Sequence, residues 1–291
     1  MIIYDEPVYR PPSEARSLII QASLGCSHNR CIFCGMYKGK TFKIRSLEDI
    51  KNDIEGFSGN VSVSKVFLAD GDALALDTEM LLKILELLYK NFPKLERVSI
   101  YANPGNILKK TLSELESLKA AGLKLLYYGI ESGSDLILKK VKKGALFAHH
   151  KEAILKAHDA GFGVSATIVT GLGGQDLWQE HIEQSARLVS ESTPDYLSTL
   201  SLMMDRASLS EFKKAFGEDF TEQDDEGMLR EDRLLISEIE PQHDLVFRSN
   251  HASNALALKG TLPEDGDNLL ATIDAALDGK LCTRPGWMRG L

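Results

Sequence analysis

The sequence predicts an α/β fold, namely a partial (β/α)6 barrel of the TIM type with a C-terminal α/β elaboration. From residue 17 to about residue 200, apolar and β-branched runs alternate with helix-period segments, as in repeated βα units around a parallel sheet. Such strands are buried on both faces and leave unpaired backbone at a free edge, so a sheet of six or more units curls toward a barrel. The pattern loosens beyond about residue 200, which predicts six regular units instead of eight.

The expected strands and helices follow one another in a regular order. Strands are expected at 17–23, 65–69, 97–102, 123–130, 162–170 and 195–202, with a less regular seventh at 244–249. One helix begins after Ser46, and others are expected at 77–92, 111–121, 148–160, 176–191 and 264–278. The chain is thereby divided into a lead-in at 1–16, a core barrel at 17–204 and a C-terminal extension at 205–291.

Composition and charge argue against several classes of protein. The 291 residues carry a formal net charge of -8, which repels nucleic acid, so no nucleic-acid partner is expected. The first sixteen residues contain acidic residues and prolines where a signal peptide needs a basic stretch and then an apolar one. The most apolar stretch, 80–90, is interrupted by Lys83 and Glu86, so no membrane segment is expected. We therefore expect a cytoplasmic protein.

Three of the four cysteines lie on the loop that follows the first predicted strand. Cys26, Cys31 and Cys34 have the spacing C-x4-C-x2-C, whereas Cys282 stands alone near the end of the chain. Folds of this class carry their chemistry on such loops, and three thiolates on a 4Fe–4S cluster leave one iron open to a small molecule. The alternative is a structural zinc site that adds His28 to the three cysteines. Structural zinc usually stabilises a module without its own core, whereas this loop belongs to a domain that has one.

The cysteine loop resembles that of the radical S-adenosylmethionine (SAM) superfamily. The common pattern there is C-x3-C-x2-C with an aromatic residue before the third cysteine, which is Phe33 here, and the first gap is one residue longer in this chain. The rest of the core is similar to the coproporphyrinogen-oxidase-like and Elongator-type members. The resemblance implies a 4Fe–4S cluster on Cys26, Cys31 and Cys34 whose open iron binds SAM. Reductive cleavage would then give methionine and a 5′-deoxyadenosyl radical that abstracts hydrogen from a substrate.

The resemblance also implies SAM contacts at the carboxyl ends of later strands. The turn 70–72 corresponds to the turn that receives the methionine ammonium, the segment 131–132 to the ribose and carboxylate region, and the segment 170–171 to the stretch along the adenine. The full set of expected SAM contacts is Phe33, Asp70, Gly71, Asp72, Asn103, Glu131, Ser132, Thr170 and Gly171. Each turn also has a purely structural interpretation, as an Asp-Gly turn, an Asn-Pro turn or a helix cap.

A polar cluster follows the seventh predicted strand. The candidate substrate contacts are Arg248, Asn250, His251 and Asn254. Alternating side chains after such a strand would face the barrel cavity and hold a small-molecule substrate. The alternative is that these side chains satisfy backbone groups of an irregular loop.

The remaining predictions concern single residues and partners. The histidines at 149, 150 and 158 belong to a predicted helix and are interpreted as surface residues, whereas Tyr127 and Tyr128 are assigned to the core. Because Cys282 is alone, a second cluster is disfavoured. The expected partners are a reductant, such as a ferredoxin or flavodoxin, and an unidentified substrate, in an oxygen-sensitive enzyme. Two alternatives remain, a non-catalytic barrel with a structural zinc site and an iron–sulfur scaffold or electron carrier.

Overall fold

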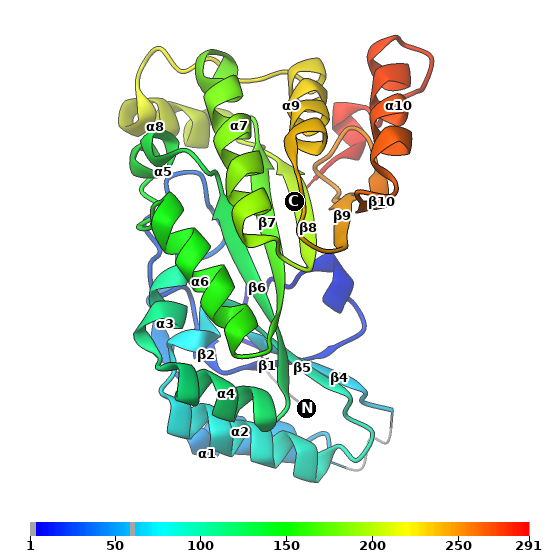
Figure 1. Ribbon diagram of the computed structural model, residues 1–291. Coiled ribbons are helices and arrows are strands. Elements are labelled where there is room, and N and C mark those ends of the chain that lie inside the picture. Colours follow the sequence, from blue (N-terminus) through cyan, green and yellow to red (C-terminus); the bar gives the residue numbers. More distant parts are fainter. Residues whose placement is uncertain (1–3, 59–61, 291) are drawn as a thin grey trace. The chain divides into compact units, whose positions relative to one another are not determined.

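A computed structural model describes residues 4–58 and 62–290 of the chain (Figure 1). The chain divides into two compact units. The first comprises the residues up to Asn29, Cys34–Tyr128 and Leu155–Val164, and the second comprises Arg30–Phe33, Gly129–Ile154 and the residues from Ser165 onward. The predicted lead-in at 1–16 and the predicted extension at 205–291 both include residues outside the described part, and the boundary at 204 stays a prediction.

The elements alternate between strands and helices along most of the chain. The strands are β1 (Leu18–Gln21), β2 (Ser23–Leu24), β3 (Lys43–Ile44), β4 (Lys65–Ala69), β5 (Arg97–Ala102), β6 (Leu123–Glu131), β7 (Gly163–Thr170), β8 (Tyr196–Ser201), β9 (Leu245–Ser249) and β10 (Leu258–Leu262). The α-helices are α1 (Leu47–Glu55), α2 (Thr78–Asn91), α3 (Pro104–Lys109), α4 (Leu112–Ala120), α5 (Asp135–Lys140), α6 (Phe147–Asp159), α7 (Gly174–Ser192), α8 (Arg206–Phe216), α9 (Asp225–Glu238) and α10 (Gly266–Leu277).

Eight strands form one mixed sheet in the order β1-β4-β5-β6-β7-β8-β9-β10. The pairings β1–β4, β4–β5, β5–β6, β7–β8 and β8–β9 are parallel, and β9–β10 is antiparallel. Within the described residues, no pairing joins β1 to β10, so the sheet is open. The mostly parallel, open sheet agrees with the predicted α/β fold with a partial barrel, and the parallel order extends through β9, the less regular seventh strand of the prediction.

In the first unit, an aromatic cluster lies on one face of β1, β4, β5 and β6. Phe67 meets the rings of Tyr101 and Tyr127 edge-on, with centroids 4.8 Å and 5.7 Å away. Tyr4 of the N-terminal segment packs against this cluster and donates a hydrogen bond to the carbonyl oxygen of Ile19 at 3.0 Å. The N-terminal segment therefore covers the edge strand β1, whose backbone groups would otherwise lack a partner strand.

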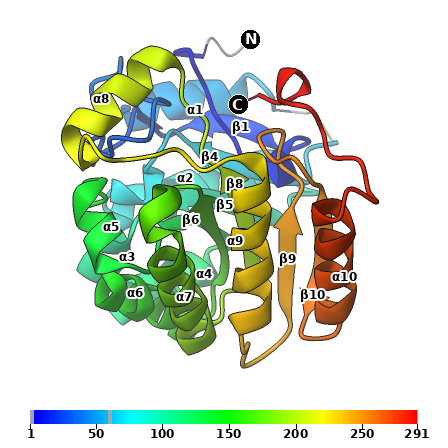
Figure 2. The same ribbon diagram turned by 90° about the horizontal axis from the view of Figure 1, so that it is seen from above.

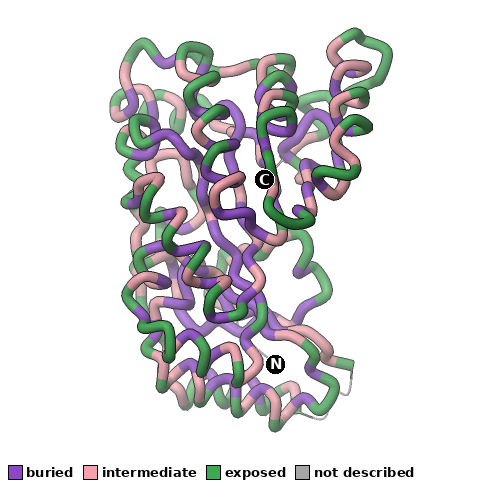
Figure 3. The backbone as a smooth tube through the Cα atoms, in the orientation of Figure 1, coloured by how far each residue is buried: buried purple, intermediate pink, exposed green. Residues whose placement is uncertain are grey.

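In the second unit, helices α7, α9 and α10 lie on one face of the strands β7–β10 (Figures 1 and 2). Leu197 of β8 and Phe247 of β9 are fully buried on that face, because side chains alternate between the two faces of a strand. The backbone tube in Figure 3 shows these strands as largely buried and the outer turns of the three helices as exposed. The apolar contact between helices and strands forms the core of this unit.

Several predicted elements are confirmed in detail. Ser46 is the N-cap of α1 and accepts a hydrogen bond from the amide of Asp49 at 3.1 Å. Tyr127 and Tyr128 are buried, at 6% and 2% exposure. In the part of the chain that the structure describes, no helix is long and apolar enough to cross a membrane.

The prediction that His150 is a surface residue is wrong. Its side chain is completely buried, because it lies one turn before Ala153 and Ile154 on the apolar stripe of α6. Burial, together with the positive charge of Lys143, holds the pKa of His150 well below its usual value. The imidazole is therefore neutral at physiological pH.

The sequence analysis missed helices α8 and α9 and the strand β10. Both helices lie in a charged stretch, but each buries a narrow apolar stripe, with Phe212 and Phe216 on α8 and Leu235 and Ile236 on α9. Because only a narrow stripe of each helix is apolar and most other residues are charged, the helical period of the apolar residues is weak in the sequence. Strand β10 has the sequence LKGTL, which contains a lysine and a glycine and depends on its pairing with β9.

Candidate functional site

The cysteine loop begins directly after β2 and is fixed at both ends by one carboxylate. Asp70 follows β4 and is completely buried. Its Oδ2 accepts hydrogen bonds from the backbone amide of Gly25 at 3.1 Å and from Lys40 Nζ at 3.2 Å. Gly25 precedes the first cysteine and Lys40 follows the third, so Asp70 closes the loop that carries the thiols.

The second oxygen of Asp70 is also engaged by the chain. Its Oδ1 accepts a hydrogen bond from Gln21 Nε2 at 3.0 Å. Burial raises the pKa of Asp70, while the hydrogen bonds from Gln21 and Gly25 and the nearby Lys40 act in the opposite direction. The observed contacts of Asp70 are thus structural, and its expected contact with SAM stays a prediction.

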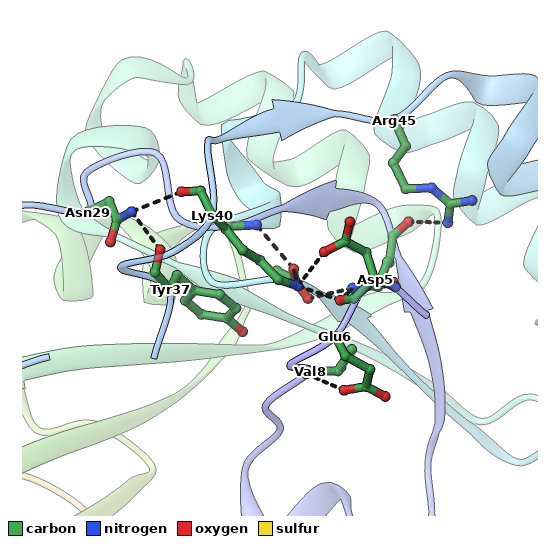
Figure 4. Close-up of polar contacts among 10 residues, drawn as sticks. Asp5, Glu6, Val8, Asn29, Tyr37, Lys40 and Arg45 are labelled. Atoms are coloured by element: carbon green, nitrogen blue, oxygen red, sulfur yellow. Dashed lines mark hydrogen bonds and ion pairs between the residues drawn. The ribbon is translucent and has the colours of Figure 1, made fainter. Parts of the chain in front are cut away.

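Lys40 links this carboxylate to the N-terminal segment (Figure 4). Its ammonium lies 2.9 Å from Asp5 Oδ1 and 3.2 Å from Asp70 Oδ2, and its side chain is only 9% exposed. The backbone amide of Asp5 donates to Gln21 Oε1 at 2.9 Å. Inside the loop, Asn29 Nδ2 donates to the carbonyl oxygen of Tyr37 at 2.8 Å. These contacts fix the loop from two sides.

A second buried carboxylate, Asp72, accepts hydrogen bonds from three side chains of two segments. Its Oδ2 accepts hydrogen bonds from Ser27 of the cysteine loop, from Asn103 and, at 2.6 Å, from Asn106. Asn103 is also the N-cap of α3 and accepts from the amide of Asn106 at 3.0 Å. The structure therefore brings together two predicted residues, Asp72 and Asn103, with Ser27 and Asn106, which the sequence analysis missed.

Gly71 occupies the closest approach between this turn and the cysteine loop. A Cβ added there would lie 2.6 Å from the Tyr37 ring and 3.2 Å from the Cβ of Cys26. Tyr37 itself is buried, at 3% exposure. Only glycine leaves space for this contact, so the backbone of the turn can lie directly against the first cysteine.

In the second unit, the loop segment Arg30–Phe33 is attached to helix α5. The amide of Ile32 donates to the carbonyl oxygen of Val141 at 3.0 Å. Phe33 packs against an apolar cluster that includes Ile137 and Phe212. Phe33 is therefore anchored by packing, and its expected contact with SAM stays a prediction.

Glu131, at the carboxyl end of β6, combines an unusual backbone with a charged partner. Its φ angle of 68° lies in the left-handed region, which is unfavourable for a residue with a side chain. Its Oε1 lies 2.8 Å from Lys143 Nζ, and both side chains are 12% exposed. Backbone strain of this kind is typical of functional sites.

A buried histidine connects the carboxyl ends of β6 and β7. His181 of α7 lies with Nδ1 2.8 Å from the Ser132 hydroxyl and Nε2 3.0 Å from the carbonyl oxygen of Val169. Because a carbonyl only accepts, Nε2 carries the proton and Nδ1 accepts from Ser132. Burial lowers the pKa of His181 to about 4, so the ring is neutral. The sequence analysis missed His181, which has no sequence motif of its own.

The glycine segment after β7 is held by an acid from the C-terminal part of the chain. The amide of Gly171 donates to Glu231 Oε2 of α9 at 2.7 Å, and Glu231 is completely buried. The pKa of Glu231 is raised to about 8, chiefly by burial and to a smaller extent by the neighbouring Asp232, while the hydrogen bonds from Gly171 and Gln223 act in the opposite direction. The hydroxyl of Thr170 donates to the carbonyl oxygen of Leu200 at 3.3 Å. The hydroxyl proton of Thr170 is therefore engaged in a hydrogen bond within the protein.

The candidate substrate residues divide into two kinds. Asn254 is buried and donates to the carbonyl oxygen of Thr199 at 2.8 Å, and His251 Nδ1 lies 2.8 Å from the Ser253 hydroxyl. These contacts support the structural interpretation of both residues. Arg248 is half-buried on β9, and Asn250 is exposed beyond the end of that strand.

The three clustered cysteines are half-buried and Cys282 is exposed, and none of the four is in a disulfide bond. Cys26 and Cys34 belong to the first unit and Cys31 to the second. Across residues 4–58 and 62–290, no group of three or more His, Cys, Asp or Glu side chains is arranged around a metal position. The donor set itself, three thiols on one turn-rich loop, matches the ligands of iron–sulfur clusters.

Comparisons with known proteins give relatives in sequence and in fold. Over 164 residues, the chain is 29% identical to a Methanocaldococcus jannaschii protein provisionally named a methylthiotransferase, a match that covers 53% of this chain and 35% of that protein. The chain thus spans about a third of the length of this curated relative. Methylornithine synthase (PylB) has a TM-score of 0.55 at 17% identity, covering 88% of this chain and 68% of that one. Coproporphyrinogen III oxidase (HemN) from Escherichia coli has a TM-score of 0.58 at 19% identity, covering 76% of this chain and 50% of that one.

These two structures show a shared fold and confirm the predicted fold class. The sequence profile of the radical SAM superfamily matches residues 20–189, which is more than half of the chain. The matched segment includes the cysteine loop and the carboxyl ends of β4, β5, β6 and β7. The cofactors of this superfamily are a 4Fe–4S cluster and SAM. The chain belongs to the radical SAM superfamily.

Proposed function

We propose that this protein is an enzyme that cleaves SAM reductively to methionine and a 5′-deoxyadenosyl radical, and that the radical abstracts hydrogen from a small-molecule substrate. The observation that carries the proposal is the half-buried C-x4-C-x2-C loop in a chain of the radical SAM superfamily. When bound, the cluster supplies an electron and an open iron site for SAM. The residues of the chain hold the cluster and orient SAM and the substrate.

Cys26, Cys31 and Cys34 would hold the cluster. The contacts of the loop support this assignment, because Asp70 fixes both loop ends and Gly71 lies against Cys26 without a side chain between them. A loop fixed before the cofactor binds loses less conformational entropy on binding. We therefore assign Asp70 a positioning role.

Some residues beyond the loop would contact SAM directly, and others would hold those residues in place. Asp72 offers buried negative charge that suits an ammonium group, and Asn103 and Asn106 hold its carboxylate in place. Glu131 offers a carboxylate suited to ribose hydroxyls, oriented by Lys143.

Two predicted contacts are better explained as supports. The hydroxyls of Ser132 and Thr170 are used within the chain, so these residues would shape the site through their backbone. The backbone amide of the next residue, Gly171, is bound in turn by Glu231. The segment expected to lie along the adenine is thereby held from α9.

The proposed chemistry also implies the compartment, the oxygen sensitivity and the reductant of the enzyme. A 5′-deoxyadenosyl radical reacts with oxygen, which suits an oxygen-sensitive enzyme in the reducing cytoplasm, with a ferredoxin or flavodoxin as reductant. Membership in the superfamily does not favour the zinc alternative or the electron-carrier alternative.

The test is anaerobic reconstitution with iron and sulfide, followed by dithionite and SAM. Iron, zinc and 5′-deoxyadenosine are quantified for the wild type, for the triple variant Cys26→Ala/Cys31→Ala/Cys34→Ala and for the control Cys282→Ala. We expect four irons per chain and deoxyadenosine from the wild type and the control, and neither from the triple variant. Stoichiometric zinc with intact SAM in the wild type would instead establish the structural-metal alternative.

A further inference from the structure

A lateral row of polar side chains crosses four strands of the second unit. The registers align Thr167 of β7 with Ser198 of β8, Ser198 with Arg248 of β9, and Arg248 with Lys259 of β10. Neighbouring strands lie about 4.8 Å apart, so the row extends over roughly 14 Å. Along this row, the hydroxyls of Thr167 and Ser198 are followed by the two cationic side chains.

All four side chains lie on the face opposite to the helices. Their neighbours along the strands, such as Ile168, Leu197 and Phe247, are completely buried, and helices α7, α9 and α10 cover one face of these strands (Figure 2). The members of the row are half-buried, except for Lys259, which is exposed. Because side chains alternate along a strand, the row belongs to the face that the helices leave uncovered.

The two cations lie beside each other without a compensating carboxylate. Arg248 and Lys259 are directly opposite in an antiparallel pair, where like charges are destabilising. Within the described part of the chain, neither forms an ion pair, although the protein as a whole carries a formal net charge of -8. An acidic protein that keeps two adjacent cations unpaired on an open face has a local site for negative charge.

The guanidinium of Arg248 is already oriented. Its Nη1 donates to the carbonyl oxygens of Phe247 at 2.6 Å and of Gly260 at 3.2 Å. These two bonds fix the plane of the group against the β9–β10 hairpin. The remaining N–H groups of the planar guanidinium have the geometry that binds a carboxylate or a phosphate through two parallel hydrogen bonds.

We infer that the row Thr167–Ser198–Arg248–Lys259 binds an anionic group, a carboxylate or a phosphate, of the substrate. Arg248 binds the anion directly, Lys259 adds charge at the rim, and the two hydroxyls bind polar atoms further along the molecule. The inference rests on the proposed function in taking the ligand to be the substrate of the radical. It narrows the substrate class to small anionic molecules.

The test measures binding of two probes, succinate and inorganic phosphate, by calorimetry at low ionic strength. The protein is reconstituted anaerobically, and 5′-deoxyadenosine formation is measured on the same preparation. The variants are Arg248→Gln, Lys259→Glu and the control Lys280→Gln, an exposed lysine at the end of α10 that pairs with Asp278. Comparing succinate with phosphate distinguishes the two kinds of anion.

We expect the wild type to bind at least one probe, and the loss of Arg248 to weaken binding about tenfold, as for a charged hydrogen-bonded contact. Lys259→Glu should weaken binding as well, and because Lys259 is exposed this variant stays folded even if Arg248→Gln does not. The control should bind like the wild type. Absence of binding by both probes, or equal binding by wild type and Lys259→Glu, overturns the inference.

The two proposals fail separately. Deoxyadenosine without anion binding would leave the proposed function intact and remove the anionic substrate class. Anion binding that depends on Lys259 without deoxyadenosine would leave a genuine anion site in a protein that does not cleave SAM.

Discussion

Glu231→Gln should remove a large part of the pH dependence of stability of this protein. In the folded chain, burial raises the pKa of Glu231 from 4.5 to about 8. The unfolded chain therefore releases this proton near pH 4.5, whereas the folded chain keeps it until about pH 8. A raised folded pKa means that the stabilisation is complete below the unfolded value and is lost as pH rises through the folded value. Wild-type stability should thus fall between about pH 5 and about pH 8.5.

The magnitude follows from the difference of about 3.5 between the two pKa values. At 1.36 kcal/mol for each pH unit, the upper bound is about 5 kcal/mol, and relaxation around the buried acid reduces it, so we expect on the order of 2–5 kcal/mol. That is a substantial fraction of the 5–15 kcal/mol typical of a folded domain. The amide in Glu231→Gln stays neutral at every pH and keeps an oxygen for the Gly171 amide.

The assay is urea-induced unfolding of the reduced, cluster-free protein at about pH 5.5, 7 and 8.5, followed by far-ultraviolet circular dichroism. The control is Glu226→Gln on the same helix, whose side chain is 59% exposed and pairs with Arg230. Relative to Glu231→Gln, the wild type should lose stability steadily as pH rises, so that the variant gains on it by the amount estimated above, whereas the control should follow the wild type. Parallel pH profiles for wild type and Glu231→Gln would refute the assigned pKa and its cause.

Two further predictions concern the supports of the site. His181→Phe removes the partner of the Ser132 hydroxyl and of a buried carbonyl, so the free energy of unfolding should fall by about 2–4 kcal/mol; urea unfolding that shows no loss would mean that these contacts carry no stability. Asp70→Asn weakens the closure of the cysteine loop through Gly25 and Lys40, so an iron chelator should remove the cluster several-fold faster than from the wild type, as expected for the loss of about 1–2 kcal/mol. Equal rates of iron loss would show that Asp70 does not position the loop.

Many features of the fold were predictable because they depend on local sequence. Ser46 caps α1, and the buried runs that became β4, β5 and β7 are recognisable from apolar residues within a few positions. Helices α8 and α9 escaped prediction because only a narrow stripe of each is apolar. The burial of His150 escaped for a related reason, since only the packing of α6 decides which side of the helix faces the core.

The sequence alone determined the chemistry that the chain can carry. Three closely spaced cysteines after a strand, and acidic or amide residues at the ends of later strands, are properties of types and spacing, which survive without coordinates. These properties alone carry the resemblance to the radical SAM superfamily. They did not distinguish a residue that binds a ligand from one that supports its neighbours, because both kinds occur at the same turns.

The tertiary structure decided those roles, because hydrogen-bond partners come from segments far apart in sequence. Asp70 meets Gly25 and Lys40, and Ser132 meets His181, only when distant elements pack together. The same holds for the two cations of β9 and β10, which lie eleven positions apart along the chain and become direct neighbours through antiparallel pairing. Spacing along a chain specifies which groups are present, whereas the register of strands and the packing of helices specify which groups share a site.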